Sequence, residues 1–390
     1  MPYDFDEVIP RRGTNSIKYD FARERGMPEG LLPMWVADMD FRAPREVIER
    51  LVEAAAHGIF GYSAAKEDYY QSLGRWFERR YGYAVNKSWV VKVPGVVFAL
   101  ATAIKAYTEP GEAVIIQNPV YYPFTGCVRE NGRKLVDSPL ICQDGRYRMD
   151  FEDLERKIVS EKAKLMLLCS PHNPVSRVWT EEELKELGRI CLKHHCLIVS
   201  DEIHADFVFG GRTHHVLTKA DKSLEEITVL LTAPSKTFNL AALHLANAVI
   251  PNPELRKLFS AEVSRTGISQ LSVMGLVACK AAYDHGEQWL TELLAYLEGN
   301  IKLAKEKAQG PLAPVKLIEP EGTYLLWLDM SPLGLSDKAI NELVINKARL
   351  WLDEGTMFGP NGAGFQRLNM ACPRMVLAEA LDRLAQAIRS

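Results

Sequence analysis

Short apolar runs alternate with helical patterns through the middle of this chain of 390 residues. Each run is bounded by polar or turn residues, which is typical of parallel strands that are buried on both faces of a sheet. Strands and helices that alternate over about 200 residues predict a doubly wound α/β domain. The expected strands cover residues 112–117, 164–169, 196–200, 227–232 and 245–250.

The last third of the chain has a different pattern. It contains a long helical stretch, then a β segment, then two further helical stretches: 287–308, 322–330, 338–348 and 376–388. A chain of this length also exceeds one ordinary core of about 200 residues. We therefore expect a large domain, 45–285, with a mostly parallel sheet flanked by helices, and a smaller α+β domain formed by 1–44 and 286–390.

A lysine follows one of the expected strands. Lys236 stands four residues after 227–232, in a turn with Pro234 and Ser235. An ammonium group at this edge of a sheet is partly desolvated, which lowers its pKa, and the neutral amine can condense with an aldehyde. Taken alone, such a lysine is more often a solvated loop residue, so the interpretation depends on its neighbours.

Polar side chains follow two other expected strands. Asp201 comes directly after 196–200, where a carboxylate is costly to bury unless a cation, such as a protonated pyridine nitrogen, pairs with it. Asn173 lies after 164–169, between two prolines that favour an extended turn, and could donate to a phenolate oxygen. Each has an ordinary alternative, a helix cap for Asp201 and a turn asparagine for Asn173.

Two further segments could complete a site for a phosphorylated aromatic ring. Gly95, Val96 and Val97 open a helical pattern, where backbone N–H groups can bind a phosphate. Tyr121 follows 112–117 and could stack on a ring. Ligands of open α/β sheets bind beyond the carboxyl ends of the strands. Together with the lysine, the aspartate and the asparagine, these residues predict a site for pyridoxal 5′-phosphate (PLP).

The whole chain resembles the fold type I PLP enzymes, the aspartate aminotransferase superfamily. Several stretches are similar to its cystathionine β-lyase and cysteine C–S lyase branch, above all Met34 to Phe41 (MWVADMDF). The other stretches that carry the resemblance are 61–63, 170–179, 201–207, 233–240 and 367–374.

The resemblance implies a role for each candidate residue. Lys236 would bind the cofactor as a Schiff base and move the Cα proton of the substrate, and Asp201 would pair with the ring nitrogen. The phenolate oxygen would accept hydrogen bonds from Asn173 and His204, and Tyr121 would stack on the ring. The phosphate would be bound by Gly95, Val96, Val97 and Ser235, and by Tyr62 of a partner subunit, so a homodimer is implied. The substrate α-carboxylate would be bound by Arg367 and by backbone near Ala37.

Three positions depart from the pattern of the family. Ser176 and Ala242 stand where glycine is usual, and His244 stands where other members often have arginine or glutamine. We expect a reshaped turn after Pro174 and an altered phosphate affinity. None of the three removes a group that the Schiff-base chemistry needs.

The resemblance implies β-elimination of cystathionine or a related cysteine S-conjugate to a thiol, pyruvate and ammonia. The first alternative is an aminotransferase acting on a small amino acid, and the second is a regulatory protein of the same fold with incidental lyase activity. An NAD-dependent dehydrogenase is disfavoured because no GxGxxG motif follows the strands.

Composition excludes several other classes. The net charge is −3 with both signs interleaved, so a nucleic-acid partner is not expected. No apolar run reaches the roughly 20 residues of a membrane span, and the N-terminus lacks the apolar core of a secretory signal. We therefore expect a cytoplasmic protein without a membrane partner. Because the histidine pairs 194–195 and 214–215 lack the i, i+4 spacing of metal ligands on a helix, no metal site is expected either.

Overall fold

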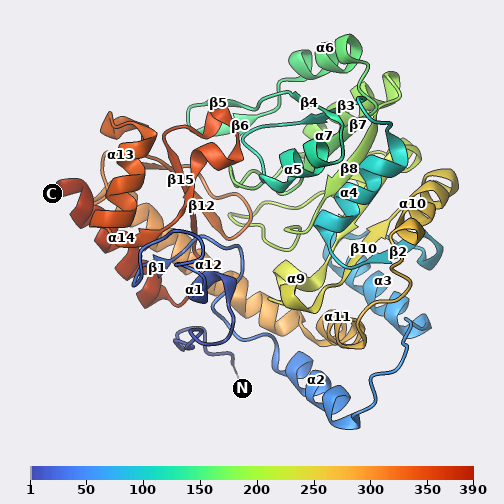
Figure 1. The fold of residues 1–390 in the computed structure, drawn as a ribbon, viewed down its shortest axis with the longest axis horizontal. Helices are drawn as coiled ribbons and strands as arrows, with labels where there is room; N and C mark the ends of the chain where they lie inside the picture. The colour runs from blue at the N-terminus through green and yellow to red at the C-terminus, as the bar shows by residue number, and fades with distance from the viewer. Residues whose placement is uncertain (1) are drawn as a thin grey trace.

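The expected alternation of strands and helices builds one seven-stranded sheet in the computed structural model, which describes residues 2–390 (Figure 1). The prediction of an α/β fold with a mostly parallel sheet flanked by helices is confirmed. In spatial order the strands are β2 (Val90–Val93), β10 (Ala246–Val249), β9 (Thr228–Thr232), β8 (Leu197–Asp201), β7 (Leu165–Cys169), β3 (Ala113–Ile116) and β4 (Lys134–Asp137).

One expected strand direction is wrong. β10 was expected to be parallel to the other strands, but it pairs antiparallel with both β2 and β9. A strand that runs parallel to the strand before it needs a crossover connection, which is usually an α-helix. The chain between β9 and β10 contains only α9 (Pro234–Thr237) and a 3-10 turn, Ala241–Leu243, so it turns back at the same end of the sheet.

Alternate side chains of the central strands pack against two different layers of helices. In β7, Leu165 and Leu167 join a cluster with α4 (Val96–Tyr107), α5 (Pro123–Glu130) and α10 (Pro253–Arg265). Met166 and Leu168 join a cluster with α6 (Phe151–Glu161) and α7 (Glu181–Lys193) on the other face. Since successive side chains of a strand point to opposite faces, an apolar run buried on both sides needs both layers.

The strand register brings the ends of three strands to one line. Cys169 of β7 lies beside Asp201 of β8, which lies beside Leu231 of β9. The segments that leave these strands therefore emerge next to one another. This is the edge at which the sequence predicts a ligand site.

A second, antiparallel sheet forms from the C-terminal part of the chain. Its order is β11 (Lys316–Leu317), β12 (Leu325–Asp329), β15 (Phe365–Asn369) and β14 (Asp353–Glu354). The helices of this part are α12 (Glu287–Gln309), α13 (Asp337–Glu342), the π turn Leu343–Lys347 and α14 (Arg374–Arg389). The division into domains 45–285 and 1–44 plus 286–390 remains a prediction.

The N-terminal segment lies against the C-terminal part, where Figure 1 draws it in dark blue. After the single turn α1 (Ile17–Asp20), β1 (Leu32–Pro33) pairs in parallel with β13 (Leu350–Trp351). The residues that follow β1 then run toward the large sheet. The smaller elements are the hairpin β5 (Ile141–Gln143) and β6 (Arg146–Arg148) and the turn α8 (Leu217–Ala220).

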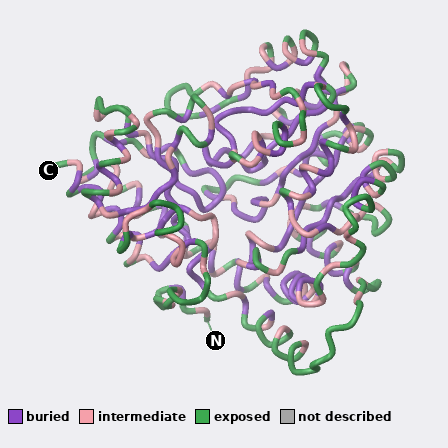
Figure 2. Tube along the Cα trace, in the orientation of Figure 1, coloured by how far each residue is buried: buried purple, intermediate pink, exposed green. Residues whose placement is uncertain are grey.

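Three helices pack together in the lower part of Figure 1. They are α2 (Arg45–His57), α3 (Glu67–Tyr81) and α11 (Val273–His285), and α11 contacts both of the others. Between α2 and α3 the extended segment 58–66 is largely exposed, which Figure 2 shows in green. None of the helices in residues 2–390 has both the length and the apolar character that crossing a bilayer requires.

Candidate active site

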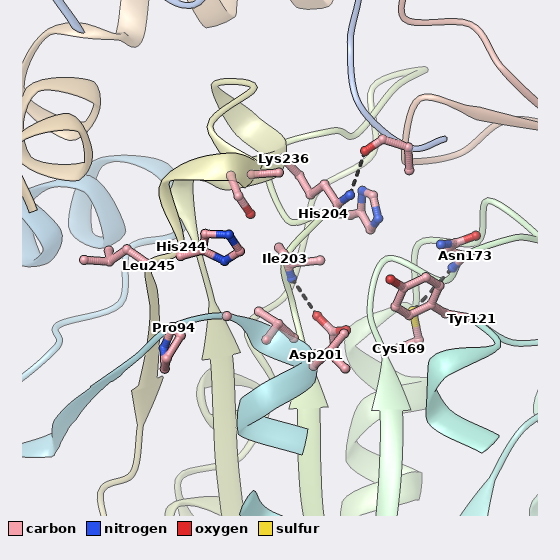
Figure 3. Close-up of a pocket in the computed structure, with 16 residues that line it drawn as sticks. Pro94, Tyr121, Cys169, Asn173, Asp201, Ile203, His204, Lys236, His244 and Leu245 are labelled. Carbon is pink, nitrogen blue, oxygen red and sulfur yellow. Dashed lines mark hydrogen bonds between the residues drawn. The ribbon is translucent and has the colours of Figure 1, made fainter. Parts of the chain in front are cut away.

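A cavity of about 170 Å³ opens at the carboxyl ends of β7, β8 and β9 (Figure 3). Its lining includes all of the predicted site residues except Tyr62 and Arg367. These are Ala37, Gly95, Val96, Val97, Tyr121, Asn173, Asp201, His204, Ser235 and Lys236. The lining also contains His244, one of the three departures from the family pattern. The sequence did not single out its remaining members for this site: Pro94, Cys169, Ile203, Ala241 and Leu245.

Lys236 lies in α9, the single turn that begins at Pro234 just after β9. Its Nζ donates a hydrogen bond to the backbone oxygen of Ala37 at 2.6 Å. Burial lowers the pKa of Lys236 to about 8, against the opposing effect of the carboxylate of Asp38. A substantial fraction of the amine is therefore neutral near pH 7–8, the form that attacks an aldehyde.

Asp201 is the last residue of β8 and is only 3% exposed. One carboxylate oxygen accepts a hydrogen bond from the Ile203 N–H at 3.2 Å. Burial raises the pKa of Asp201 to about 7. Within residues 2–390 the carboxylate makes no ion pair, so a cation placed in the cavity would remove the main cost of its burial.

Arg367 of β15 lies just behind Asn173 rather than on the cavity wall. Its Nη1 donates to Asn173 Oδ1 at 2.9 Å, its Nη2 donates to the backbone oxygen of Trp35 at 2.8 Å, and it forms a buried ion pair with Asp353. Its Nε has no hydrogen-bond partner in the described part of the chain. A buried guanidinium with a free donor is suited to a carboxylate, which can accept two parallel hydrogen bonds.

The same contact fixes the orientation of Asn173. Because Arg367 donates to its side-chain oxygen, the amide nitrogen of Asn173 remains available as a donor, and Figure 3 shows it turned toward the cavity. The backbone oxygen of Asn173 accepts from the Tyr121 N–H at 3.0 Å, which ties the aromatic ring to the asparagine turn. The ring of Tyr121 and the side-chain amide of Asn173 therefore face the same cavity.

His204 is buried, and its Nδ1 has no partner among residues 2–390. Burial lowers the pKa of His204 well below its usual value, and the positive charges of Lys236 and Arg367 lower it further. The imidazole is therefore neutral and can donate one N–H into the site.

The opposite end of the cavity is built to receive an anion. α4 begins at Val96, and its first helical hydrogen bond runs from the Ala99 N–H to the Gly95 oxygen, so the N–H groups of Val96 and Val97 have no partner within the helix. A Cβ on Gly95 would meet no atom within 4 Å. Ser235 and His244 also belong to the lining, and Figure 3 draws His244 on the side of Pro94. Free N–H groups at the start of a twelve-residue helix favour a phosphate.

Comparison with known proteins identifies the family. The family of class I and II aminotransferases matches residues 32–384. The chain belongs to this family. It is 42% identical to cystathionine β-lyase PatB of Bacillus subtilis over 99% of this chain and 100% of that protein.

Two solved structures superpose closely on this chain. Cystalysin of Treponema denticola, a PLP-containing structure, has a TM-score of 0.96 at 36% identity, covering 100% of this chain and 99% of the other. The PLP-bound C–S lyase of Staphylococcus hominis has a TM-score of 0.93 at 31% identity, with the same coverage. The predicted membership in the fold type I cystathionine β-lyase branch is confirmed.

Tyr62 is the other predicted site residue that is absent from the cavity lining. It is 97% exposed and lies in the segment between α2 and α3. A side chain that serves the site of a partner subunit would be exposed in the isolated chain, so its placement leaves the predicted role open.

The departures from the family pattern have different structural contexts. Ser176 adopts a left-handed backbone with φ of 57°, a conformation that glycine adopts more easily, and its Oγ donates to the Leu325 oxygen at 2.6 Å. Ala242 is exposed, outside the cavity lining. His244 lies in the cavity lining.

Two functional contacts were missed at the sequence level. The Tyr324 hydroxyl donates to the Ala37 oxygen at 2.9 Å, the same oxygen that binds Lys236. Asp353 pairs with Arg367. An acidic residue after the apolar run 350–352 was a usable signal for Asp353, whereas nothing in the pattern around Tyr324 distinguishes it from a core residue.

Proposed function

We propose that this protein is a PLP-dependent carbon–sulfur β-lyase that cleaves cystathionine or a related cysteine S-conjugate to a thiol, pyruvate and ammonia. The observation that carries the proposal is a pair of groups in one cavity: Lys236, whose pKa is lowered by burial, and Asp201, a buried carboxylate without a cation. The names of the relatives, cystathionine β-lyase and C–S lyase, support this reaction over transamination.

The residues of the cavity fit PLP at each of its functional groups. Asp201 would pair with the ring nitrogen, Asn173 and His204 would donate to the phenolate oxygen, and Tyr121 would cover one face of the ring. Gly95, Val96, Val97 and Ser235 would bind the phosphate. The unpartnered atoms His204 Nδ1 and the N–H groups of Val96 and Val97 are the donors that such a ligand would satisfy.

Bound PLP supplies a conjugated ring that takes up the electron pair left when the substrate loses its Cα proton. Arg367 binds the substrate α-carboxylate, helped by backbone near Ala37, and so orients the Cα–H bond. Lys236 Nζ takes the Cα proton, and Asp201 keeps the proton on the ring nitrogen. The bond from Cβ to sulfur would then break, and the sulfur would leave with the bonding electron pair and take up a proton to become the thiol. Addition of one water to the remaining three-carbon unit would give pyruvate and ammonia.

The proposal includes a homodimer with shared sites. The exposed segment 58–66 presents Ile59, Phe60 and Tyr62 to solvent, three large side chains that a partner subunit would cover. Tyr62 would then reach the phosphate in the partner's cavity. The cytoplasmic location remains a prediction.

The test uses purified protein loaded with PLP and given L-cystathionine without any keto acid. We expect continuous release of pyruvate and free thiol in equal amounts. A single conversion of the cofactor to its amine form, with turnover restored by adding a keto acid, would show an aminotransferase instead. Failure to convert any amino acid while PLP stays bound would favour the regulatory alternative.

A further inference from the structure

Four charged side chains form a cluster beside the cavity, here called the arm cluster: Arg11, Lys18, Asp38 and Asp40. Arg11 binds Asp38 with both guanidinium Nη atoms, at 3.0 and 2.6 Å, and Asp40 at 2.7 Å. Lys18 is only 1% exposed and lies 2.8 Å from Asp40 and 3.6 Å from Asp38. Two cations and two carboxylates thus offset one another's charge, with Lys18 and Asp40 buried and Arg11 and Asp38 each 21% exposed.

The arm cluster fixes a backbone segment that touches the proposed catalytic lysine. Ala37, next to Asp38, accepts the hydrogen bond from Lys236 Nζ. The side chain of Asn239, three residues after Lys236, makes two hydrogen bonds to the backbone of Met39. Its Oδ1 accepts from the Met39 N–H, and its Nδ2 donates to the Met39 oxygen. The position of the Ala37 carbonyl is therefore set from both sides, by the arm cluster and by the lysine turn.

Asn369 at the end of β15 holds the same segment from the C-terminal sheet. Its Nδ2 donates to the backbone oxygens of Val36 and Asp38, each at 2.6 Å. Asp38 is thus fixed close to the lysine and cannot turn away without breaking several hydrogen bonds.

The charges that act on Lys236 come from three elements. Asp38 in the N-terminal arm and Asp201 at the end of β8 favour its protonated form, while Arg367 of β15 disfavours it. His204 and Tyr324 also border this space, and burial keeps both neutral near pH 7. Asp38 differs from Asp201 because Arg11 and Lys18 lie against it and offset its charge.

We propose that Arg11 and Lys18 are positioning residues that mask the charge of Asp38 and thereby keep the nitrogen of Lys236 easy to deprotonate. This inference rests on the proposed function, in which Lys236 is the proton-transferring amine. An unmasked Asp38 would stabilise the positive charge on the lysine nitrogen, and a cluster without Asp38 would leave two cations that oppose it. The two changes therefore act in opposite directions.

The test is a pH titration of the visible absorbance of PLP-loaded protein, which reports the protonation of the linkage between the cofactor and the Lys236 nitrogen. We expect Arg11→Gln to raise the midpoint and Asp38→Asn to lower it, each by about 0.5–1 pH unit. If the two substitutions only loosened the segment, they would not shift the titration midpoint in opposite directions.

Two further variants separate charge from packing. Arg11→Lys keeps the charge but loses the two-pronged contact, so its midpoint should stay near that of the unmodified protein. Arg42→Gln removes an exposed arginine of the same arm, 61% exposed and paired with Glu7, and should change nothing.

The outcomes distinguish the proposed function of the protein from the role of the arm cluster. A missing visible band in the unmodified protein overturns the proposed function, and the inference with it. A normal band whose midpoint moves the same way in Arg11→Gln and Asp38→Asn, or stays fixed in both, overturns only the role of the arm cluster. Opposite shifts, with Arg11→Lys and Arg42→Gln unchanged, support it.

Discussion

At the scale of single residues, the environment of Lys236 leads to a prediction about pH. Burial lowers the pKa of its amine to about 8, so the neutral, nucleophilic form grows as the pH rises through that value. The rate at which cofactor-free protein captures PLP should reach about half of its maximum near pH 8 and level off about one pH unit higher. Stopped-flow absorbance measures this rate; a rise that continues past pH 10 would show an ordinary exposed lysine.

Arg367 gives a second prediction at this scale. Lysine in its place keeps the charge but cannot offer two parallel donors to a carboxylate or bind Asn173, Trp35 and Asp353 together. We expect Arg367→Lys to lower kcat/KM about 10–100-fold, with KM contributing most of the loss. Steady-state kinetics measure the effect, with Arg42→Lys as an exposed control. An unchanged KM would contradict the proposed role.

The residues that the sequence could identify are those placed by the ends of strands. Lys236, Asp201 and Asn173 each follow an apolar run, and the carboxyl ends of neighbouring parallel strands meet at one edge. Tyr324 and the ion pair of Asp353 were not predictable in this way, since their contacts depend on how the C-terminal sheet packs against the N-terminal arm.

At the scale of elements, the turn after Pro174 can be tested through Ser176. Its hydroxyl stabilises the turn by a buried hydrogen bond to Leu325, while its left-handed backbone costs about 1 kcal/mol that glycine avoids. Ser176→Ala loses the bond and keeps the strain, so it should be less stable by about 1 kcal/mol. Ser176→Gly loses the bond but relieves the strain.

The measurement for this pair is the thermal midpoint of the PLP-loaded protein. We expect the glycine variant to lie near the unmodified protein and the alanine variant clearly below it. If alanine were the more stable of the two, the backbone conformation assigned to residue 176 would be wrong.

The positions of five strands of the large sheet were predictable from apolar runs, whereas the edge strands β2 and β4 were not predicted, and strand direction was not predictable. Each expected strand of the large sheet appears within about two residues of its predicted bounds, because burial on both faces gives a uniform apolar run. The same run arises in an antiparallel strand such as β10 when both of its faces are covered. Only the connection reveals direction, and here the short helix α9 is too small to be a crossover.

At the scale of the whole molecule, the proposed dimer predicts complementation between two inactive variants. Tyr62→Ala and Lys236→Ala damage different components of a site built from two subunits. A mixed dimer would contain one site with both residues intact. Subunits that exchange at random should therefore regain about a quarter of the unmodified activity, measured as pyruvate release.

Each variant alone, and the two mixed without subunit exchange, are the controls for this experiment. No recovery in dimers that have been shown to exchange would mean that Tyr62 acts within its own chain or not at all. Such a result would leave the assignment of Lys236 untouched.

The site also depends on the chain as a whole. The N-terminal arm passes from the C-terminal part, where β1 pairs with β13, to the lysine turn of the large sheet. Nothing periodic in residues 1–44 predicts this path, because beyond the two-residue pairing of β1 the arm is held by side-chain hydrogen bonds. The family resemblance of MWVADMDF was the sole signal for it.

We propose that the cavity around Lys236 binds PLP through that lysine. The direct measurement is borohydride reduction of PLP-loaded protein, followed by peptide mass mapping. We predict a pyridoxyl group on Lys236 alone, and loss of both the visible band and the label in Lys236→Ala. A label on another lysine, or a visible band that survives in Lys236→Ala, would contradict the assignment of Lys236 as the lysine that binds PLP.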